Sequence, residues 1–132
     1  MTIFVDTSAF LAVLNADDQN HASAKEAWDK MVSHEETLLC TNYILVETFA
    51  LVQHRLGMEA ARTLHDDILP LVSVEWIDAQ SHYSSVIAKL VAGRRRLSLV
   101  DCASFETMRR LGLSTAFAFD RDFKGQGFEI IP

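Results

Sequence analysis

The sequence predicts an α/β fold: a three-layer domain with a mostly parallel central sheet of four to five strands and helices on both faces. Short apolar runs alternate along the chain with longer segments of helical periodicity, and strands separated by helices form βα units with parallel strands. The length of 132 residues and the 49% hydrophobic content suffice for one core, because domains most often run to about 100–150 residues. Residues 1–132 are therefore expected to form a single domain.

The first half of the chain is expected to contain two strands and four helices. Ser8 can cap the first helix and Asn42 the third, because their side chains accept hydrogen bonds from the free N–H groups at a helix start. Gly57 stands where glycine commonly ends a helix, and Pro70 closes the fourth helix. The predicted elements are a strand at 3–5, a helix from Ser8 to residue 14, a helix at 21–32, a strand at 38–40, and helices at 43–56 and 59–68.

The second half is expected to alternate strands and helices again. Residues 71–76 alternate in polarity and contain enough β-branched side chains for a strand. Asp78 can cap the helix that follows, and Ser98 starts the next one, which ends before Gly112. The predicted elements are a strand at 71–76, a helix to about residue 91, a loop at 93–97, a helix at 98–111, and strands at 115–119 and 128–131.

Acidic residues follow two of the apolar strands. Asp6 comes directly after the first strand and Asp120 directly after the fourth, with Asp122 two residues further on. The carboxyl ends of parallel strands meet at one edge of a sheet, where α/β proteins bind ligands, so these distant residues are expected to converge. Each also has an ordinary explanation, Asp6 as a helix cap and Asp120 as part of a solvated turn.

Two further acids lie inside predicted helices. Glu47 and Thr48 are the only residues between 43 and 52 that are not apolar, so this helix is expected to be buried and Glu47 to need a counter-charge. Asp101 stands three residues after Ser98, as in a capping box, which explains it without a metal. A divalent metal with oxygen ligands explains Asp6, Glu47, Asp101 and Asp120 together, and it points to hydrolytic phosphate chemistry.

The charge distribution bears on the partner. A net charge of −6 and a pI near 5.2 argue at first sight against nucleic acid, but bound divalent cations would offset much of the acidic charge. The basic residues are concentrated near the C-terminal end, at Arg94, Arg95, Arg96, Arg109, Arg110, Arg121 and Lys124. The run at 94–96 could hold RNA phosphates, because the arginine fork matches phosphate oxygens, or it could be a solvated loop.

Other residue classes offer no competing site. Cys40 and Cys102 lack metal-site spacing and are expected to be small buried residues in a reducing compartment. Trp28 and Trp76 fall on apolar stripes and are expected in the core or at an interface. No apolar stretch approaches the ~20 residues that span a bilayer, and the N-terminus has no signal-peptide pattern, so a cytoplasmic protein without a membrane partner is expected.

The ordered acidic motifs resemble those of PIN-domain ribonucleases, and most of all the VapC-type toxins of bacterial toxin–antitoxin pairs. The motifs are, in chain order, Val5-Asp6-Thr7-Ser8-Ala9, Asn42 followed by Glu47 in a helix, Ser98-Leu99-Val100-Asp101, and Phe119-Asp120-Arg121-Asp122-Phe123. The resemblance covers the whole chain. One departure is Ala118, which stands where many members have a threonine or serine, so one hydroxyl contact of the family's site is in question.

The resemblance implies an endoribonuclease that depends on Mg²⁺ or Mn²⁺. Its catalytic residues would be Asp6, Glu47, Asp101 and Asp120, and its metal ligands would be Asp6, Asp101, Asp120 and Asp122. Its RNA-binding residues would be Ser8, Arg94, Arg95 and Arg96. It also implies an RNA substrate, a cognate antitoxin and a homodimer.

Two other function classes stay open on the sequence. One is a catalytically silent PIN-like module that binds RNA or a protein, and the other is a small magnesium-dependent phosphatase. Asp6-Thr7-Ser8 begins like the motif of haloacid-dehalogenase phosphatases, but Ser8 stands where their second aspartate belongs. Motifs of serine hydrolases, P-loop proteins and dinucleotide-binding proteins are absent.

Overall fold

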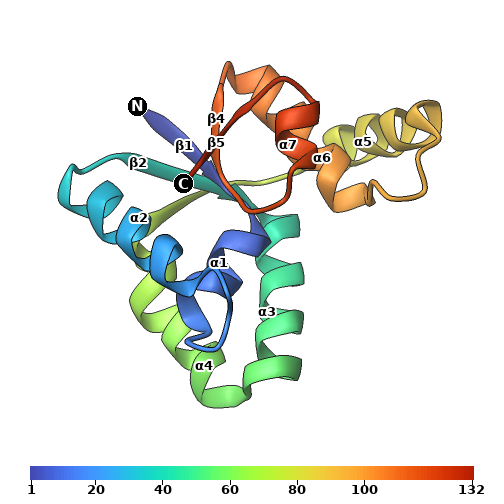
Figure 1. Cartoon of the computed structure of the whole chain (residues 1–132). Coiled ribbons are helices and arrows are strands. Elements are labelled where there is room, and N and C mark those ends of the chain that lie inside the picture. The colour runs from blue at the N-terminus through green and yellow to red at the C-terminus, as the bar shows by residue number, and fades with distance from the viewer.

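Five parallel strands form the centre of the structure, a computed structural model that describes residues 1–132 (Figure 1). The strands are β1 (Thr2–Val5), β2 (Thr37–Thr41), β3 (Val72–Glu75), β4 (Thr115–Phe117) and β5 (Glu129–Ile131). They lie in the order β3-β2-β1-β4-β5, and every neighbouring pair is parallel. Phe4 of β1 stands opposite Leu39 on one side and Ala116 on the other. The predicted parallel α/β sheet is confirmed.

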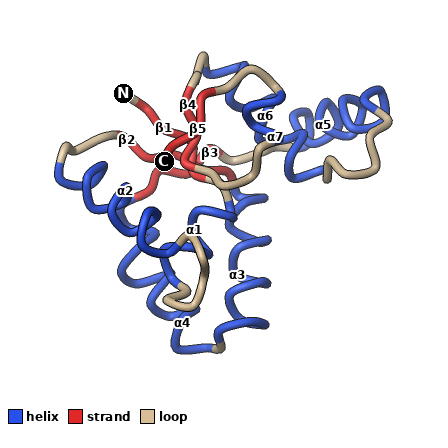
Figure 2. The backbone as a smooth tube through the Cα atoms, in the orientation of Figure 1, coloured by secondary structure: helices blue, strands red, loops and turns tan.

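The chain has seven α-helices, most of which pack beside the sheet (Figure 2). They are α1 (Thr7–Leu14), α2 (His21–Ser33), α3 (Asn42–Leu56), α4 (Met58–Thr63), α5 (Ala79–Ala92), α6 (Leu99–Leu111) and α7 (Asp122–Gly125). A connection between parallel strands is almost always right-handed, so reversing the direction of strand addition after β3 moves the later helices to the other face. Figure 1 accordingly shows α1 to α4 on one side of the sheet and α6 and α7 on the other.

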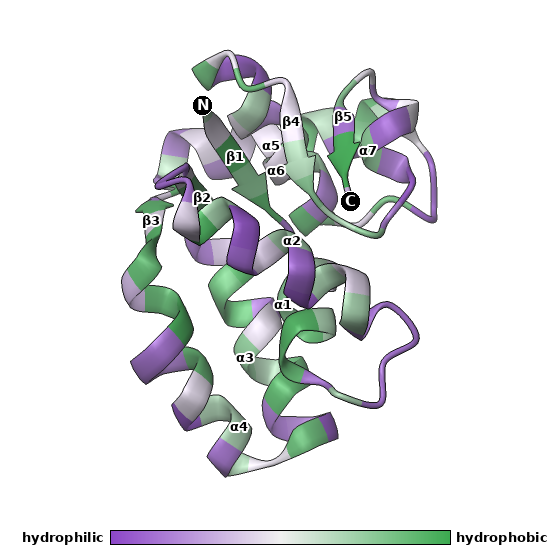
Figure 3. Ribbon diagram, turned by 60° about the vertical axis from the view of Figure 1, so that its left-hand side comes forward, coloured by the Kyte–Doolittle hydropathy of each residue, from purple (hydrophilic) through white to green (hydrophobic).

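The central strands are buried on both faces, as their unbroken apolar sequences require. Phe4, Val5 and Phe117 have no exposed surface. On the side of α6 and α7, the Phe105 ring lies 5.0 Å from that of Phe123, measured between centroids, and so packs these two helices together. On the other side, α1 is apolar along most of its length (Figure 3). The sheet therefore forms a rigid base for the residues at its edge.

Several local predictions were wrong in detail. The first and third helices are capped by Asp6 and Thr41, not by Ser8 and Asn42, because these residues have extended backbones and accept the N–H bonds. Strand β4 ends at Phe117, before Asp120. The predicted helix at 59–68 is α4 followed by a turn of π-helix at Leu64–Ile68 and a 3₁₀ turn at Leu69–Leu71, and α7 was not predicted.

The tryptophans and cysteines separate into core and surface. Trp28, Cys40 and Cys102 are buried, and both thiols are free. Trp76 is 69% exposed, so it is not a core residue. None of the helices combines the length and the apolar character that a membrane crossing requires.

Candidate metal centre

Asp6 lies at the carboxyl end of β1 and is almost completely buried, with 6% of its surface exposed. Its backbone N–H donates to the Phe117 carbonyl at 3.0 Å, which extends the β1–β4 pairing by one residue. Its Oδ2 accepts from the Ser8 hydroxyl at 2.6 Å and from the Ser8 N–H at 3.2 Å, so the carboxylate caps α1.

Burial raises the pKa of the Asp6 carboxyl to about 6, and the two Ser8 hydrogen bonds offset part of this rise. The negative charges of Asp101 and Asp120 raise the pKa further. These three carboxyl groups, from three separate elements, therefore interact electrostatically. A cation among them would relieve the repulsion.

The Ser8 hydroxyl connects the ends of β1 and β4. It donates to Asp6 Oδ2 and accepts from the Phe119 N–H at 3.0 Å. The single proton of this hydroxyl is thus used inside the protein. Ser8 fixes the Asp6 carboxylate relative to the segment that carries Asp120.

Asp120 and Asp122 follow β4 and begin α7. Asp120 Oδ1 accepts from the Asp122 N–H at 2.9 Å. Burial raises the pKa of Asp120, and the charges of Asp122 and Asp101 add to the rise. The Asp122 side chain is 12% exposed and forms an ion pair with Arg96.

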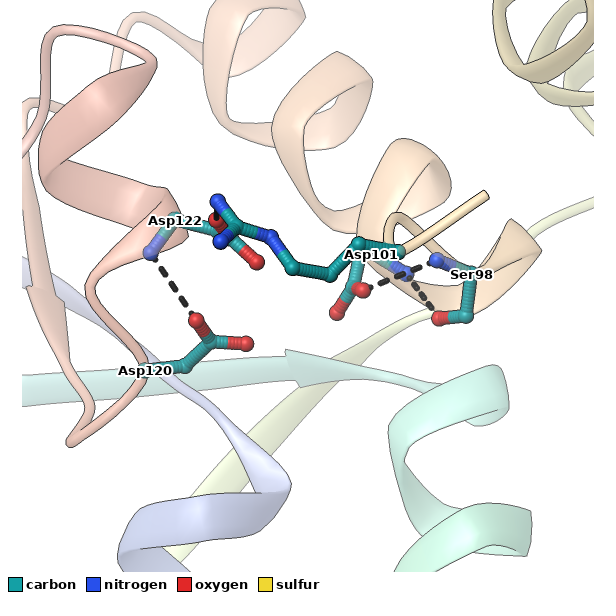
Figure 4. A network of polar contacts seen from close by, with 5 residues as sticks. Ser98, Asp101, Asp120 and Asp122 are labelled. Carbon is teal, nitrogen blue, oxygen red and sulfur yellow. Dashed lines mark hydrogen bonds and ion pairs between the residues drawn. The ribbon is translucent and has the colours of Figure 1, made fainter. Parts of the chain in front are cut away.

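Asp101 is both part of the capping box of α6 and a member of the acidic group. Its Oδ2 accepts from the Ser98 N–H at 2.9 Å, and its own N–H donates to Ser98 Oγ at 3.0 Å, which completes the expected capping box. One carboxylate oxygen from each of Asp101, Asp120 and Asp122 lies within 4.8 Å of the other two. Figure 4 shows the three carboxylates turned toward a common space.

This group lies where the strand order reverses. Strands β2 and β3 were added on one side of β1, and β4 and β5 on the other. Ligands of open parallel sheets bind at such switch points, outside the carboxyl ends of the strands. Clustered carboxylate oxygens are the hard ligands that Mg²⁺ and Mn²⁺ prefer, so the residues present fit a divalent metal.

Glu47 lies outside this group. It is half-buried on α3 and has no hydrogen-bond or ion-pair partner, and the prediction that its helix is buried was wrong, since Val46 beside it is 71% exposed. The next residue, Thr48, is buried, and its hydroxyl lies 3.0 Å from that of Thr7, directly after Asp6. The Thr7–Thr48 contact therefore places this part of α3 beside the end of β1.

The three consecutive arginines differ in their contacts. Arg94, Arg95 and Arg96 are all exposed, and only Arg96 has an acidic partner. The residues of this pair are 26 positions apart in the chain, so no local pattern in the sequence indicated it. Sequence reasoning also missed that α5 exposes an apolar face, although the helical spacing of Tyr83, Ile87, Leu90 and Val91 could have revealed the stripe.

Comparison with known proteins agrees with this architecture. The PIN domain family model matches residues 3–129. The 23S rRNA-specific endonuclease VapC20 of Mycobacterium tuberculosis is 35% identical over 127 residues, which are 96% of this chain and 95% of the relative. A crystal structure of that protein, titled a sarcin-ricin loop cleaving toxin, superposes with a TM-score of 0.87 at 36% identity, over 98% of this chain and 99% of the other.

A more distant structure shares the fold alone. VapBC2 from Rickettsia felis, bound to a DNA fragment from its promoter, superposes with a TM-score of 0.72 at 13% identity, over 98% of this chain and 97% of the other. The resemblance found in the sequence is thus confirmed by the family model and by a relative that spans nearly the whole chain. The chain belongs to the PIN domain family.

Proposed function

We propose that this chain is a metal-dependent endoribonuclease and that residues 1–132 act as one PIN-like unit. The observation that carries the proposal is the convergence of carboxylates from β1, α6 and the segment after β4 at the switch point of the sheet. The 35% identity with an endonuclease along almost the whole chain supports the same reaction class. One continuous core of 26 buried residues supports a single unit.

The carboxylates have distinct roles in this proposal. Asp101, Asp120 and Asp122 hold a Mg²⁺ or Mn²⁺ ion, and Asp6 completes the site from the buried side. A bound ion supplies an activated water and neutralises the charge that develops on the leaving oxygen. Asp6 and Asp101 keep their oxygens in place through Ser8 and Ser98, respectively. Glu47 acts through a water molecule, because its side chain has no partner of its own.

Basic residues on both sides of the acidic group bind the RNA backbone. Arg94 and Arg95 precede α6, and Arg121 and Lys124 belong to the α7 segment; all four side chains are exposed. Arginine and lysine contacts to phosphates supply affinity that does not depend on sequence and weakens with salt. Ser8 contributes indirectly, by holding Asp6, because its hydroxyl proton is already donated within the protein.

The relative's name suggests the first substrate to test. VapC20 is named a 23S rRNA-specific endonuclease, so 23S rRNA is the proposed target here, and the cytoplasm, where ribosomes are found, is the proposed site of action. The two alternatives have less support. Membership of the PIN family argues against a phosphatase, and the retained carboxylates argue against a silent module.

A second protein keeps the nuclease inactive until it is needed. The structure of VapC20 is titled that of a toxin, and an enzyme that cleaves its own cell's RNA requires inhibition. The acidic centre would accept a basic side chain of such an antitoxin, since charge-assisted pairs with carboxylates are strong.

The chain forms a homodimer through α5. Trp76, Tyr83, Ile87, Leu90 and Val91, here called the α5 surface, are between 62% and 82% exposed. Figure 1 shows α5 projecting from the side of the molecule. Monomeric proteins rarely expose contiguous apolar patches above a few hundred Å², and the two aromatic residues alone expose roughly 100–170 Å² each. The helix carries a single charged side chain, Lys89, so two copies can approach with little repulsion.

The test is a cleavage assay with purified protein, 23S rRNA and a mixed RNA pool, with Mg²⁺, Mn²⁺ or a chelator. Wild type should cut RNA only with metal. Asp120→Asn should lose at least 100-fold in rate, roughly the loss seen when one charge-stabilising group is removed from a catalytic site. Asp29→Asn, a change of an exposed aspartate on α2, should keep the wild-type rate. Hydrolysis of a simple phosphomonoester instead of RNA would favour the phosphatase, and absence of metal binding would favour the silent module.

A further inference from the structure

Arg96 forms an ion pair with one of the carboxylates of the candidate metal centre. Its Nη2 forms a hydrogen-bonded ion pair with Asp122 Oδ1. The Asp122 side chain is 12% exposed, whereas that of Arg96 is 70% exposed. The arginine therefore reaches in from solvent and places its positive charge at the rim of the three-carboxylate cluster.

The loop before α6 holds Arg96 in this position. Gly93 ends α5 with φ of +62°, a left-handed conformation that glycine adopts without strain. The Arg94 carbonyl then accepts from Lys89 Nζ at 2.6 Å and from the Leu97 N–H at 3.1 Å. Leu97 is 2% exposed and anchors the other end of the loop. The backbone at Arg96 is thus fixed, while its long side chain is free to move.

A guanidinium and a divalent ion compete for the same carboxylate. Asp122 belongs to the group whose oxygens lie within 4.8 Å of one another. An ion bound there would bring two further positive charges close to Arg96, and like charges repel at short range. One of the two cations must move, and only Arg96 has an alternative position, in solvent.

We propose that Arg96 is an internal competitor for the metal centre: it neutralises Asp122 when no metal is bound, and metal binding releases it to hold an RNA phosphate. The proposal rests on the metal dependence proposed above. The Arg96 side chain of this pair is mostly exposed, so the pair is weak and the exchange is easily reversible. Once released, the guanidinium offers the planar fork that binds phosphate oxygens in pairs.

The first experiment measures metal affinity without RNA. Calorimetric titration of Mn²⁺ should show about 1.4- to fivefold tighter binding to Arg96→Gln than to wild type, the range typical of a weak ion pair near the surface. Arg95→Gln removes the same charge from the preceding residue, which has no acidic partner. This variant should change the metal affinity less. In an Asp122→Asn background, Arg96→Gln should have no further effect, because the two side chains act through each other.

Three results would overturn the proposal. Weaker metal binding by Arg96→Gln would mean that Arg96 merely orients Asp122 as a ligand. Equal effects of Arg96→Gln and Arg95→Gln would mean that only the general charge of the loop matters. An undiminished effect of Arg96→Gln in the Asp122→Asn background would exclude the ion pair as the cause.

The second experiment concerns RNA. Binding of a mixed-sequence phosphorothioate RNA, followed by fluorescence anisotropy, should tighten on addition of Mn²⁺ more in wild type than in Arg96→Gln. An equal gain in both proteins would contradict the release of Arg96 toward RNA. Because neither experiment depends on cleavage, their failure is distinguishable from failure of the nuclease assignment, which the cleavage assay tests.

Discussion

At the scale of single residues, Asp6 combines two roles that conflict energetically. It caps α1 through its hydrogen bonds to Ser8, and it presents a buried negative charge beside Asp101 and Asp120. Its pKa rises from 3.8 to about 6 on folding. A carboxyl with a raised pKa stabilises the fold only when it is protonated, so stability falls as the pH rises through about 6. The buried charge of Asp6 therefore lowers the stability of the metal-free protein at neutral pH.

Asp6→Asn is expected to stabilise the metal-free protein at about pH 7. The amide keeps the shape of the carboxyl without its charge, and two pKa units correspond to about 3 kcal/mol in the free energy of unfolding. The advantage should disappear below about pH 3, where Asp6 is protonated in both states. Urea denaturation in chelator at both pH values checks this. A variant less stable than wild type at neutral pH, or a gap independent of pH, would refute the explanation.

At the scale of structural elements, the Ser8 hydroxyl joins the turn after β1 to the segment after β4. Without this hydroxyl, the Phe119 N–H would lose its acceptor and Asp6 Oδ2 would lose one of its donors. An unsatisfied buried group costs about 1–3 kcal/mol. Ser8→Ala should therefore lower the unfolding free energy by that amount and weaken Mn²⁺ binding, and Ser8→Thr should restore both. Denaturation and calorimetry give the two values. Ser23→Ala, which removes an exposed hydroxyl of α2, is the control and should change neither.

The apolar face of α5 supplies a second prediction at this scale. Leu90 is 73% exposed in the isolated chain, and a glutamate there would bring like charges together across a two-fold interface. Light scattering after gel filtration should find a dimer for wild type and a monomer for Leu90→Glu. Met58→Glu, an equivalent change at an exposed residue of α4, should leave the dimer intact. A wild-type monomer, or a dimer that survives Leu90→Glu, would argue against this surface.

The elements also show what local sequence can and cannot predict. All five strands were predicted: apolar runs located the central strands, which are buried on both faces, and alternating polarity located β3. The caps were placed one or two residues late, because Asp6 and Ser8, or Thr41 and Asn42, are equally good cap residues by type. The difference lies in backbone angles set by the sheet. The helix around Glu47 was predicted to be buried because it is nearly apolar on all sides, but one of its apolar side chains, Val46, is exposed to solvent.

At the scale of the whole molecule, strand order determines which acids meet. The sequence predicted that Asp6 and Asp120 would share an edge, which needs only parallel strands. It could not specify that β1 and β4 are neighbours, nor that Arg96 would reach Asp122, because both depend on the path of the chain through space. Glu47, on α3, and Asp6, after β1, are not among the three carboxylates whose oxygens lie within 4.8 Å of one another, and their part in the site stays a prediction.

Metal binding should stabilise the whole fold. The acids repel in the metal-free protein, and a ligand that binds only the folded state at 100 times its dissociation constant adds about 2.7 kcal/mol. For a chain of this length the melting temperature should rise by about 10 °C. Calorimetric scans with and without Mn²⁺ measure the rise, which should shrink strongly in Asp120→Asn and persist in Asp29→Asn. An equal rise in melting temperature in all three proteins would mean that the ions bind at another site.

The most direct test of the metal centre is to locate the ion. Crystals soaked in Mn²⁺ should give an anomalous difference peak among the carboxylates of Asp101, Asp120 and Asp122, next to buried Asp6, and crystals of Asp120→Asn should lack it. A peak in wild type that lies away from these carboxylates, or no peak in a protein that still cleaves RNA, would contradict the account.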